Sequence, residues 1–587
     1  MSASPVPSAA AAASTSAAGA AQARSGSSSP VHKRARRDEA DAPSGSAAAT
    51  SAAPSAAAAP RTEPTKALAA RKRGRAAQMA KFGVPPVEHD VRRLLGADVV
   101  ARLEAEGRDW ELRASGEVCD VRIETLGSGG DGLAKAPSGD WAIVVPHVLP
   151  GELVRVRWWS NERMWSKADL LEVLEPSEKR LPAPCPYFGQ CGGCQYQMLS
   201  YDEQLAHKQL VVERAFANYS GLPAELLPRI GATLPSPQQL RYRTKLTPHF
   251  DLPRELRRGK GGRAPKGGMP SAGEVEQIAR ALPIGFDQVK GNGILDIEEC
   301  IIATPTINEA LPRIRQGVRD RIASYKNGAT LLLRDSFVKN PAADGAAATE
   351  VVLDEAPAPA APREELSEVI TDHKAVVRER VGKIMFESPA GAFFQNNRSI
   401  LPSLLSYVEA ALRALPAFSS ESQESRFLVD TYCGSGFFAL SLAHLFSRVA
   451  GVELSAESIA CATRNATLNS ITNCEFLAGS AEAIFAKIKF PAERTTLIID
   501  PPRRGCDDVF LTQLLRLRPR LVVYVSCNVH TQARDIGQIL RGEPRYEVVS
   551  ACGADLFPMT YHVEGVAVLQ LRDEVPTPAT DSAAVAP

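Results

Sequence analysis

The sequence predicts a Rossmann-like, doubly wound α/β domain near the end of a chain of 587 residues. From about residue 386 to 573, apolar runs alternate with amphipathic stretches, as they do where helices connect parallel strands. The expected strands are FLVDTYCGSGF, RVAGVEL, TTLIIDPP, LVVYVSC and VAVLQL, and the expected helices include ALSLAHLFS, SAESIACATRNATLNS and DVFLTQLLRL. Sheets of this kind bind ligands at the carboxyl ends of their strands, so polar residues there are the first candidates for a site.

A second, smaller β domain is predicted over residues 113–176. VRIETLGSGGDGLAK, DWAIVVPHVLPGELVRVRWW and DLLEVLEP alternate apolar with polar residues, as half-buried strands do. Several short strands in sixty residues favour a closed barrel of the OB type. GSGGDG lies in no βαβ unit, so we interpret it as a glycine-rich turn rather than a dinucleotide-binding loop.

Both ends of the chain are expected to be disordered. Residues 1–85 are dominated by Ala, Ser and Pro and, like the tail 574–587, cannot bury enough apolar surface to offset chain entropy. HKRARR (32–37) and ARKRGR (70–75) resemble nuclear-import patches, although a solvated basic tail that attracts RNA explains them equally well. We therefore expect a nuclear or cytoplasmic protein. A mitochondrial location is disfavoured because the first basic residue is Arg24.

Composition excludes several classes of protein. The formal net charge of +1 does not by itself indicate a nucleic-acid partner, and no apolar run reaches the twenty or so residues that span a membrane. No secretory signal is recognisable, so the eleven cysteines are expected to be reduced thiols, metal ligands or catalytic groups. A soluble, monomeric, intracellular protein is the simplest expectation.

A mixed central domain is predicted over residues 177–385, and three of the cysteines lie close together at its start. Cys185, Cys191 and Cys194 have C-x5-C-x2-C spacing, and two glycines between the last two allow a tight loop. Thiolates so arranged can hold zinc or an iron–sulfur cluster, either of which needs a fourth ligand, and the alternative is a loop that keeps its shape without metal. Two low-complexity inserts, 253–274 and 340–362, are expected to be surface loops.

A cofactor pocket is predicted at the start of the α/β domain. Gly434 and Gly436 follow the first strand directly, and Glu453 ends the next strand nineteen positions after Gly434. Glycines let the backbone approach a ligand, and a carboxylate at the second strand end can hold a ribose diol. NAD fits this pattern as well as S-adenosylmethionine, but NAD binders need a third glycine where this chain has Leu440. We therefore favour S-adenosylmethionine, with Asp500 of IIDPP holding the methyl acceptor nearby.

A cysteine nucleophile is predicted at the end of the strand LVVYVS. Cys527 would emerge at the ligand edge of the sheet beside Asp500, whereas the rival Cys506 lies in a loop after DPPRR. A lone cysteine is more often a buried hydrophobe, so its position is the evidence. A thiolate that adds to carbon 6 of uracil makes carbon 5 nucleophilic toward a methyl sulfonium. A base must then remove the carbon 5 proton; Glu564, before the last strand, is the candidate and His562 the alternative.

Six motifs in order carry a family resemblance: FFQNN, DTYCGSGFF, GVELS, DPPRRG, YVSCN and HVEGV. They resemble those of the TrmA/RumA-type RNA uridine-5-methyltransferases, and with the barrel and the cysteines the resemblance spans about residues 116–572. It implies a class I methyltransferase domain, a TRAM-type RNA-binding barrel, a fungal-like member of the family and tRNA as substrate, most simply its T-loop uridine.

The resemblance also assigns site residues. It implies that Cys527 is the nucleophile, that Glu564 is the proton-abstracting base, and that S-adenosylmethionine is bound by four residues: Gln395, Tyr432, Glu453 and Asp500. A 4Fe–4S cluster is implied on Cys185, Cys191 and Cys194 with Cys300 as fourth ligand. The chain departs from the pattern at Phe437, where bacterial members often carry Asn.

Three other functions remain open at this point. An rRNA uridine-5-methyltransferase would use the same chemistry on another RNA. A base amino-group methyltransferase would share DPPR but need no thiol, so it would survive loss of Cys527. A non-catalytic RNA-binding protein would keep the fold and form no covalent adduct with RNA.

Overall fold

The computed structural model describes residues 72–77, 79, 83–111, 116–257, 268, 270–291, 293–338, 366–479 and 489–574. The nuclear-import patch at 32–37, the insert at 340–362 and the last tail residues lie outside these ranges. Among the described residues, no helix combines the length and the apolar character needed to cross a membrane.

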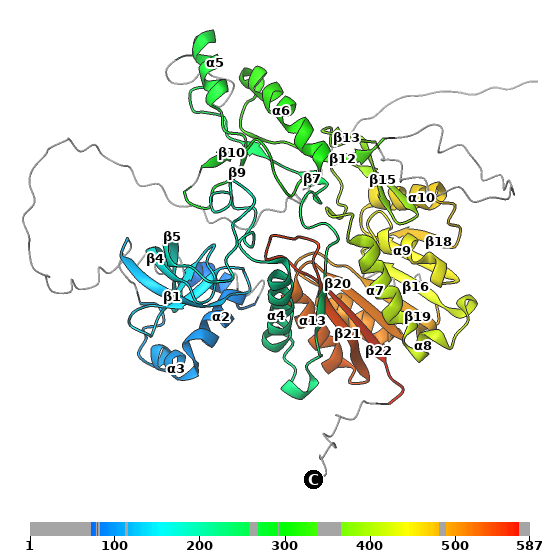
Figure 1. Cartoon of the computed structure of the whole chain (residues 1–587). Helices are drawn as coiled ribbons and strands as arrows, with labels where there is room; N and C mark the ends of the chain where they lie inside the picture. Colours follow the sequence, from blue (N-terminus) through cyan, green and yellow to red (C-terminus); the bar gives the residue numbers. More distant parts are fainter. Residues whose placement is uncertain are drawn as a thin grey trace, which may run out of the picture. The chain divides into compact units, whose positions relative to one another are not determined.

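An eight-stranded sheet forms the centre of the C-terminal half (Figure 1). Its order is β18-β17-β16-β19-β20-β22-β21-β6. The five expected strands are all present, as β16 (Phe427–Thr431), β17 (Arg448–Glu453), β19 (Thr495–Ile499), β20 (Leu521–Ser526) and β22 (Glu564–Leu571). The sequence analysis did not identify β18 (Cys474–Ala478), β21 (Tyr546–Ala554) or β6 (Gly231–Leu234). Strands β16 to β20 run parallel and β22 runs antiparallel to β20, so the prediction of a doubly wound, mostly parallel sheet is confirmed.

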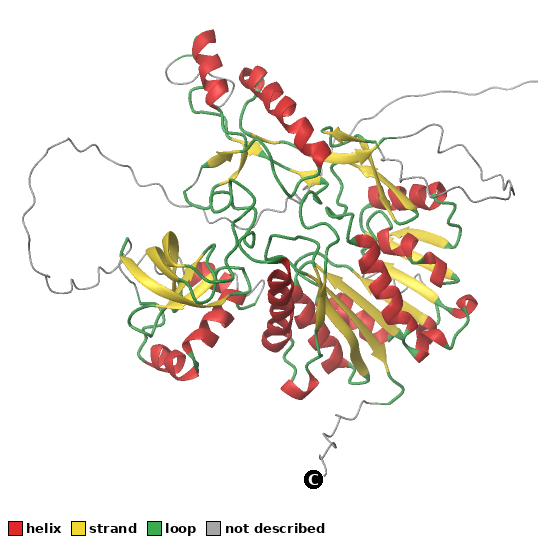
Figure 2. Cartoon of the chain, viewed as in Figure 1, coloured by secondary structure: helices red, strands yellow, loops and turns green. Residues whose placement is uncertain are grey.

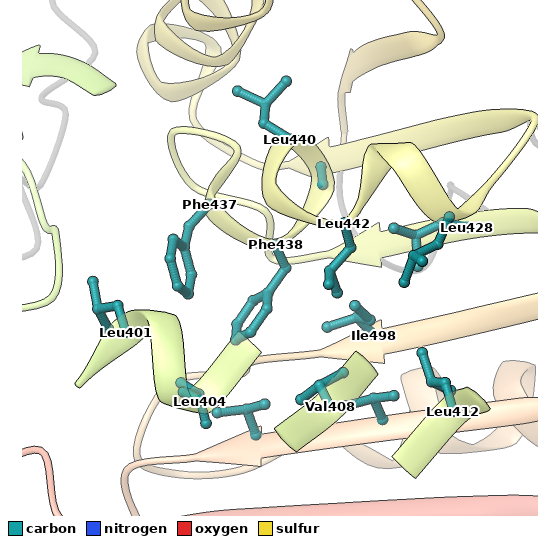
Figure 3. Packing of buried hydrophobic residues seen from close by; sticks show 14 of the residues in the cluster. Leu401, Leu404, Val408, Leu412, Leu428, Phe437, Phe438, Leu440, Leu442 and Ile498 are labelled. Carbon is teal, nitrogen blue, oxygen red and sulfur yellow. The ribbon is translucent and has the colours of Figure 1, made fainter. Parts of the chain in front are cut away.

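Helices cover both faces of this sheet (Figure 2). One face packs on α7 (Leu401–Arg413) and α9 (Phe437–Ser441), where apolar side chains interlock with those of the central strands (Figure 3). The other face packs on α4 (Tyr201–Tyr219), α12 (Asp508–Leu517) and α13 (Val529–Gly542). Apolar side chains on both faces explain why the strands read as continuous hydrophobic runs. A further helix, α10 (Ala456–Leu468), connects β17 to β18.

The predicted barrel is present as a closed sheet of five strands, ordered β1-β2-β3-β5-β4. The strands are β1 (Val118–Leu126), β2 (Gly132–Lys135), β3 (Ala142–Val145), β4 (Leu153–Asn161) and β5 (Trp165–Glu175). Trp141 is fully buried inside it and donates its indole N–H to Ser166 Oγ at 2.9 Å, which satisfies its polar atom.

Two helices that the sequence analysis did not assign precede the barrel, α2 (Pro86–Leu95) and α3 (Ala97–Ala105). Residues 72–77, placed in the predicted disordered tail, are helical, and Arg75 donates to the buried Glu88 at 2.6 Å. The charge of Glu88 explains the difference, because a buried carboxylate needs cationic partners that composition alone does not reveal.

The middle of the chain contains small sheets and two longer helices. The sheets are formed by β7 (Lys245–Leu246), β8 (His249–Phe250), β9 (Gly285–Asp287), β10 (Ile294–Asp296), β11 (Ala329–Thr330), β12 (Leu333–Phe337), β13 (Ser367–Ile370), β14 (Val376–Val381) and β15 (Ile384–Pro389). The helices are α5 (Ala272–Ala281) and α6 (Pro305–Asp320). The end of the first insert is not a loop, because Ser271 and Glu274 form a reciprocal cap that starts α5.

Strand β6 and helix α4 lie in the central part of the sequence, residues 177–385, but they pack as part of the eight-stranded sheet and its helices. β6 pairs in parallel with β21, and α4 lies beside α13 (Figure 1). The central and C-terminal ranges therefore share one core.

Candidate functional site

The predicted cofactor pocket lies at the carboxyl ends of β16 and β17. Gly434 (φ 54°) and Gly436 (φ 92°) both adopt the left-handed backbone conformation, and a Cβ at Gly434 would meet no atom within 4 Å. The turn is therefore open on the side where a ligand would lie. Glu453 points back at it, since its Oε2 accepts the amide of Gly434 at 3.3 Å and its Oε1 that of Ser455 at 3.0 Å. Tyr432 begins the turn with φ 64°, a strained value for a side chain of this size.

Asp430 stabilises the same turn by joining the end of β16 to the helix that follows the turn. It is fully buried at the end of β16, and its Oδ2 accepts the amide of Ala439 at 2.9 Å. Burial and the nearby carboxylates Asp500 and Glu453 raise the pKa of Asp430 well above its usual value. The cofactor edge is therefore acidic but resists full ionisation, and a cationic ligand bound there would favour the charged forms of its carboxyls.

Four side chains come together at the ends of β19 and β20 and the start of β22. Three of them were predicted, and the fourth is Arg503. Cys527 follows β20, Asp500 follows β19, and Glu564 is the first residue of β22. Burial first, and then the charges of Glu564 and Asp500, raise the pKa of the Cys527 thiol to about 12, while Arg503 lowers it through its charge and a hydrogen bond. Thiol, two carboxyls and guanidinium thus lie within electrostatic range of one another.

The two carboxyls have unusual acidities. Burial raises the pKa of Asp500 to about 7. Burial and the charge of Asp500 raise the pKa of Glu564 well above its ordinary value, while Arg503 lowers it. Glu564 Oε1 is buried and accepts no hydrogen bond among the described residues, so it is available to a proton on a bound substrate.

The rival cysteine has a different environment. Cys506 is buried, its amide donates to Asp535 Oδ2 at 2.7 Å, and its sulfur lies 3.6 Å from the Tyr524 hydroxyl. Burial and the charge of Asp535 raise the pKa of the Cys506 thiol well above its usual value. These contacts give Cys506 a role in packing the loop after β19 rather than in attack.

His562, the alternative base, lies in the loop before β22. Its ring packs against Tyr561 at 4.2 Å, and burial together with three nearby cations lowers its pKa to about 3. Such a histidine is neutral and a weak base at physiological pH, which favours Glu564.

Gln395 lies half-buried between two anchored neighbours. Phe394 is buried, and Thr244 donates its amide to the carbonyl of Asn396 at 2.9 Å. Phe437 contacts Phe394 and Phe386 and points into the apolar cluster (Figure 3). The side chain at this departure from the family pattern therefore packs in the core.

The four cysteines of the predicted metal site come from two segments and lie near one another. Burial, followed by the charges of Cys300 and Cys185 among others, raises the pKa of Cys191 to about 11 and that of Cys194 to about 12. No three His, Cys, Asp or Glu side chains among the described residues are close enough together to hold a single metal ion. Within the described residues, the structure therefore does not bring the predicted metal ligands into a metal-binding arrangement.

Arg503 is the residue of the site that the sequence analysis did not assign. It stands in DPPRRG, directly after the carboxylate and the two prolines. Its position three residues after Asp500, on the same strand end, was the available signal.

Comparison with known proteins places the chain among RNA-modifying enzymes. A family model described as tRNA (Uracil-5-)-methyltransferase matches residues 366–572. A tRNA (uracil(54)-C(5))-methyltransferase of Schizosaccharomyces pombe is 44% identical over 454 residues, 77% of each chain. The enzyme of the same name from Saccharomyces cerevisiae is 36% identical over 486 residues, covering 77% of this chain and 74% of its own.

The fold has a solved counterpart. The Pyrococcus abyssi tRNA (uracil-54, C5)-methyltransferase, solved in complex with S-adenosyl-L-homocysteine, superposes with a TM-score of 0.52 at 23% identity. The match covers 77% of this chain and 99% of the archaeal one, so the two share the overall arrangement of a mixed α/β methyltransferase.

Proposed function

Because the chain belongs to the tRNA (uracil-5-)-methyltransferase family, we propose that it transfers a methyl group from S-adenosylmethionine to carbon 5 of a uridine in tRNA. The observation that supports this best is the convergence of Cys527, Asp500 and Glu564 at one sheet edge. Two relatives are named for uracil 54, and we propose the same T-loop position for this chain.

The residues present fit the methyl donor. The open turn at Gly434, the Glu453 carboxylate and the acidic edge suit a nucleoside bearing a positive sulfonium. Gln395, Tyr432, Glu453 and Asp500 would hold it there, and when bound it supplies an electrophilic methyl group.

Cys527 would start the reaction by adding as thiolate to carbon 6 of the uracil ring. The ring electrons would move onto the carbon 4 oxygen, which would make carbon 5 the nucleophile toward the electrophilic methyl group that the bound donor would supply. Glu564 takes the proton from carbon 5, the ring double bond reforms, and the Cys527 sulfur departs. Each step conserves charge without another reactant.

We also propose a catalytic role for Arg503. A thiol with a pKa of about 12 is almost entirely protonated at neutral pH, and Arg503 favours its thiolate. The same guanidinium lies near Glu564 and can stabilise the charge that moves between the two groups.

The decisive experiment uses tRNA that contains 5-fluorouridine. Fluorine at carbon 5 cannot leave as a proton, so the wild-type protein should form a covalent adduct that survives denaturing electrophoresis. Cys527→Ala should form none, whereas the matched control Cys506→Ala should form it. An adduct with Cys527→Ala would disprove the nucleophile, and its absence from the wild type would favour an amino-group methyltransferase or a non-catalytic RNA-binding protein.

The RNA is identified by a separate measurement. Mass spectrometry of nucleosides should find 5-methyluridine missing from tRNA, and not from rRNA, in cells that lack the protein. Loss from rRNA alone would identify the alternative substrate.

We propose that the five-stranded barrel is a TRAM-type RNA-binding domain. Arg157 is exposed on β4, and Lys167 lies over the rings of Trp159 and Trp165 at 5.7 and 5.8 Å. Arg155 is less available, because Asp120 pairs with it at 2.8 Å. Arg157→Ala should reduce the salt dependence of tRNA binding by about one charge.

We propose that Cys185, Cys191, Cys194 and Cys300 hold an iron–sulfur cluster. Three of these thiols, those of Cys191, Cys194 and Cys300, have raised pKa values and are costly to ionise unless iron neutralises them. Protein purified without oxygen should show broad visible absorbance and bound iron, and Cys194→Ser should lose both. Stoichiometric zinc instead would overturn the proposal.

A further inference from the structure

The loop between β21 and β22, residues 555–563, leads directly into Glu564. Backbone and side-chain bonds to other segments hold it along most of its length. The fully buried Lys208 donates to Asp555 Oδ1 at 2.5 Å and to the carbonyl of Phe557 at 3.1 Å. The Tyr242 hydroxyl donates to the carbonyl of Pro558 at 3.0 Å.

Met559, in the middle of this loop, is held by three hydrogen bonds of its backbone. Its amide donates to Gln204 Oε1 at 3.0 Å, and its carbonyl accepts the amides of Gln195 at 2.9 Å and Tyr196 at 3.0 Å. Its backbone has φ 68°, a conformation that a residue with a side chain adopts only where its surroundings require it.

Gln204 connects the three segments involved. It is fully buried on α4, and its amide nitrogen donates to the carbonyls of Tyr196 and Leu199 at 3.2 Å each and approaches Met559 Sδ at 3.4 Å. One side chain therefore bonds both the segment that follows the cysteine loop and the loop that leads to Glu564.

The cysteine loop contacts the same residue. Gln195 follows Cys194 directly, and Met559 packs in an apolar cluster with Cys194, Cys300 and Tyr242. The loop before Glu564 is thus held between α4 and the cysteine loop.

We propose that Gln204 is a positioning residue for the proton-abstraction step: it fixes Met559, and through the loop 555–563 it sets the placement of Glu564. This rests on the proposed function, in which Glu564 is the base. Gln204 touches neither Cys527 nor the cofactor turn in any contact of the described residues, so attack by the thiolate and methyl transfer should not depend on it. Misplacement of a reacting group by about 1 Å can cost on the order of a hundredfold in rate.

The test separates the two halves of the reaction. Gln204→Leu removes the hydrogen bonds and keeps a similar volume, and Gln209→Leu is the matched control, because Gln209 lies on the same helix and bonds Glu213 and the carbonyl of Ile230 instead. In single-turnover reactions with tRNA, we expect Gln204→Leu to accumulate the methylated covalent adduct and to release product about 10- to 100-fold more slowly. Adduct formation and S-adenosylmethionine affinity should stay within about twofold of wild type, and Gln209→Leu should behave as wild type.

Other outcomes overturn the proposal. If thiolate attack and product release slow together, the role of Gln204 is structural. If the rate of product release is unchanged, Gln204 does not set the placement of Glu564. Gln204→Leu could fail to fold, in which case it would not bind S-adenosylmethionine. Tyr242→Phe then serves as the second variant, because it loses a single hydroxyl bond to the same loop. If Tyr242→Phe does not accumulate the methylated adduct, the proposal fails. Glu564→Gln in the same assay distinguishes the two levels: if it traps the adduct and neither Gln204→Leu nor Tyr242→Phe does, the proposed function stands and this inference falls.

Discussion

Single side chains at the sheet edge divide the proposed reaction between them. Cys527 supplies the attacking sulfur, and Glu564, with a raised pKa and an unbonded Oε1, takes the proton afterwards. Two residues with separate steps should fail in different ways when they are changed.

Glu564→Gln should allow attack and methyl transfer but block release. We expect turnover to fall by roughly 10²- to 10⁴-fold, the usual contribution of a general base, while methylated adduct accumulates on denaturing gels. Wild-type turnover in this variant would show that another group is the base. His562→Ala is the matched control.

Asp500 should reduce the stability of the fold at neutral pH. Its folded pKa of about 7 lies above the ordinary value of an aspartate, so the unfolded state ionises first and stability falls as pH rises from about 4 to 7. Asp500→Asn should abolish methylation yet raise the free energy of unfolding at pH 7.5 by at least about 1.4 kcal/mol, the worth of one pKa unit. The gain should disappear near pH 4, and a gain independent of pH in urea titrations would refute the explanation.

At the scale of elements, helix α4 stabilises the C-terminal domain although it lies in the central part of the sequence. It packs on α13 and β6 and buries the ion pair of Lys208 with Asp555, both side chains being 0% exposed. Burial lowers the pKa of Lys208 and Asp555 raises it, so each charge depends on the other.

Lys208→Met should destabilise the protein by roughly 3–5 kcal/mol, because it leaves the Asp555 carboxylate buried without a partner. Urea unfolding measures this directly. The double variant Lys208→Met, Asp555→Leu should recover most of the loss, and failure to recover would mean that the charges are not the cause.

The elements of the sheet also show what sequence could and could not reveal. Strands β16, β17, β19 and β20 were predictable because they are apolar on both faces, and Cys527 because it directly follows one of them. β6 was not predictable, because its four residues gain their partner only when β21 folds beside them. Arg503 was missed for a related reason: its importance comes from Cys527 and Glu564, which are distant in sequence. The cysteine spacing indicated a candidate ligand loop but not the packing of Cys194 with Met559.

At the scale of the whole molecule, one charged node joins the barrel to α4. Asp90 of α2 accepts the amide of Ser128 at 2.7 Å and pairs with Arg214 at 3.2 Å, and Arg214 donates to the carbonyl of Leu126 at 2.8 Å. All three contacts are buried, so they are protected from screening by salt.

Arg214→Met should loosen the barrel without altering the catalytic edge. We expect the KM for tRNA to rise about tenfold, equivalent to roughly 1.4 kcal/mol, with little change in kcat or in S-adenosylmethionine affinity. Steady-state kinetics checks this, with Arg229→Met, an exposed change outside the node, as control. An equal fall in kcat would show that the node supports the active site itself.

The pairing of β6 with β21 has a consequence for how the protein is made. β6 and α4 leave the ribosome long before β21 and β22, the last two strands of the sheet. Until the C-terminal hairpin is synthesised, α4 can pack on α13, but β6 has no strand beside it, and this edge is exposed to aggregation. Glu564, the proposed base, lies in that hairpin and is therefore synthesised after Cys527. A chain that ended before the hairpin would contain the proposed nucleophile but not the base that removes the carbon 5 proton.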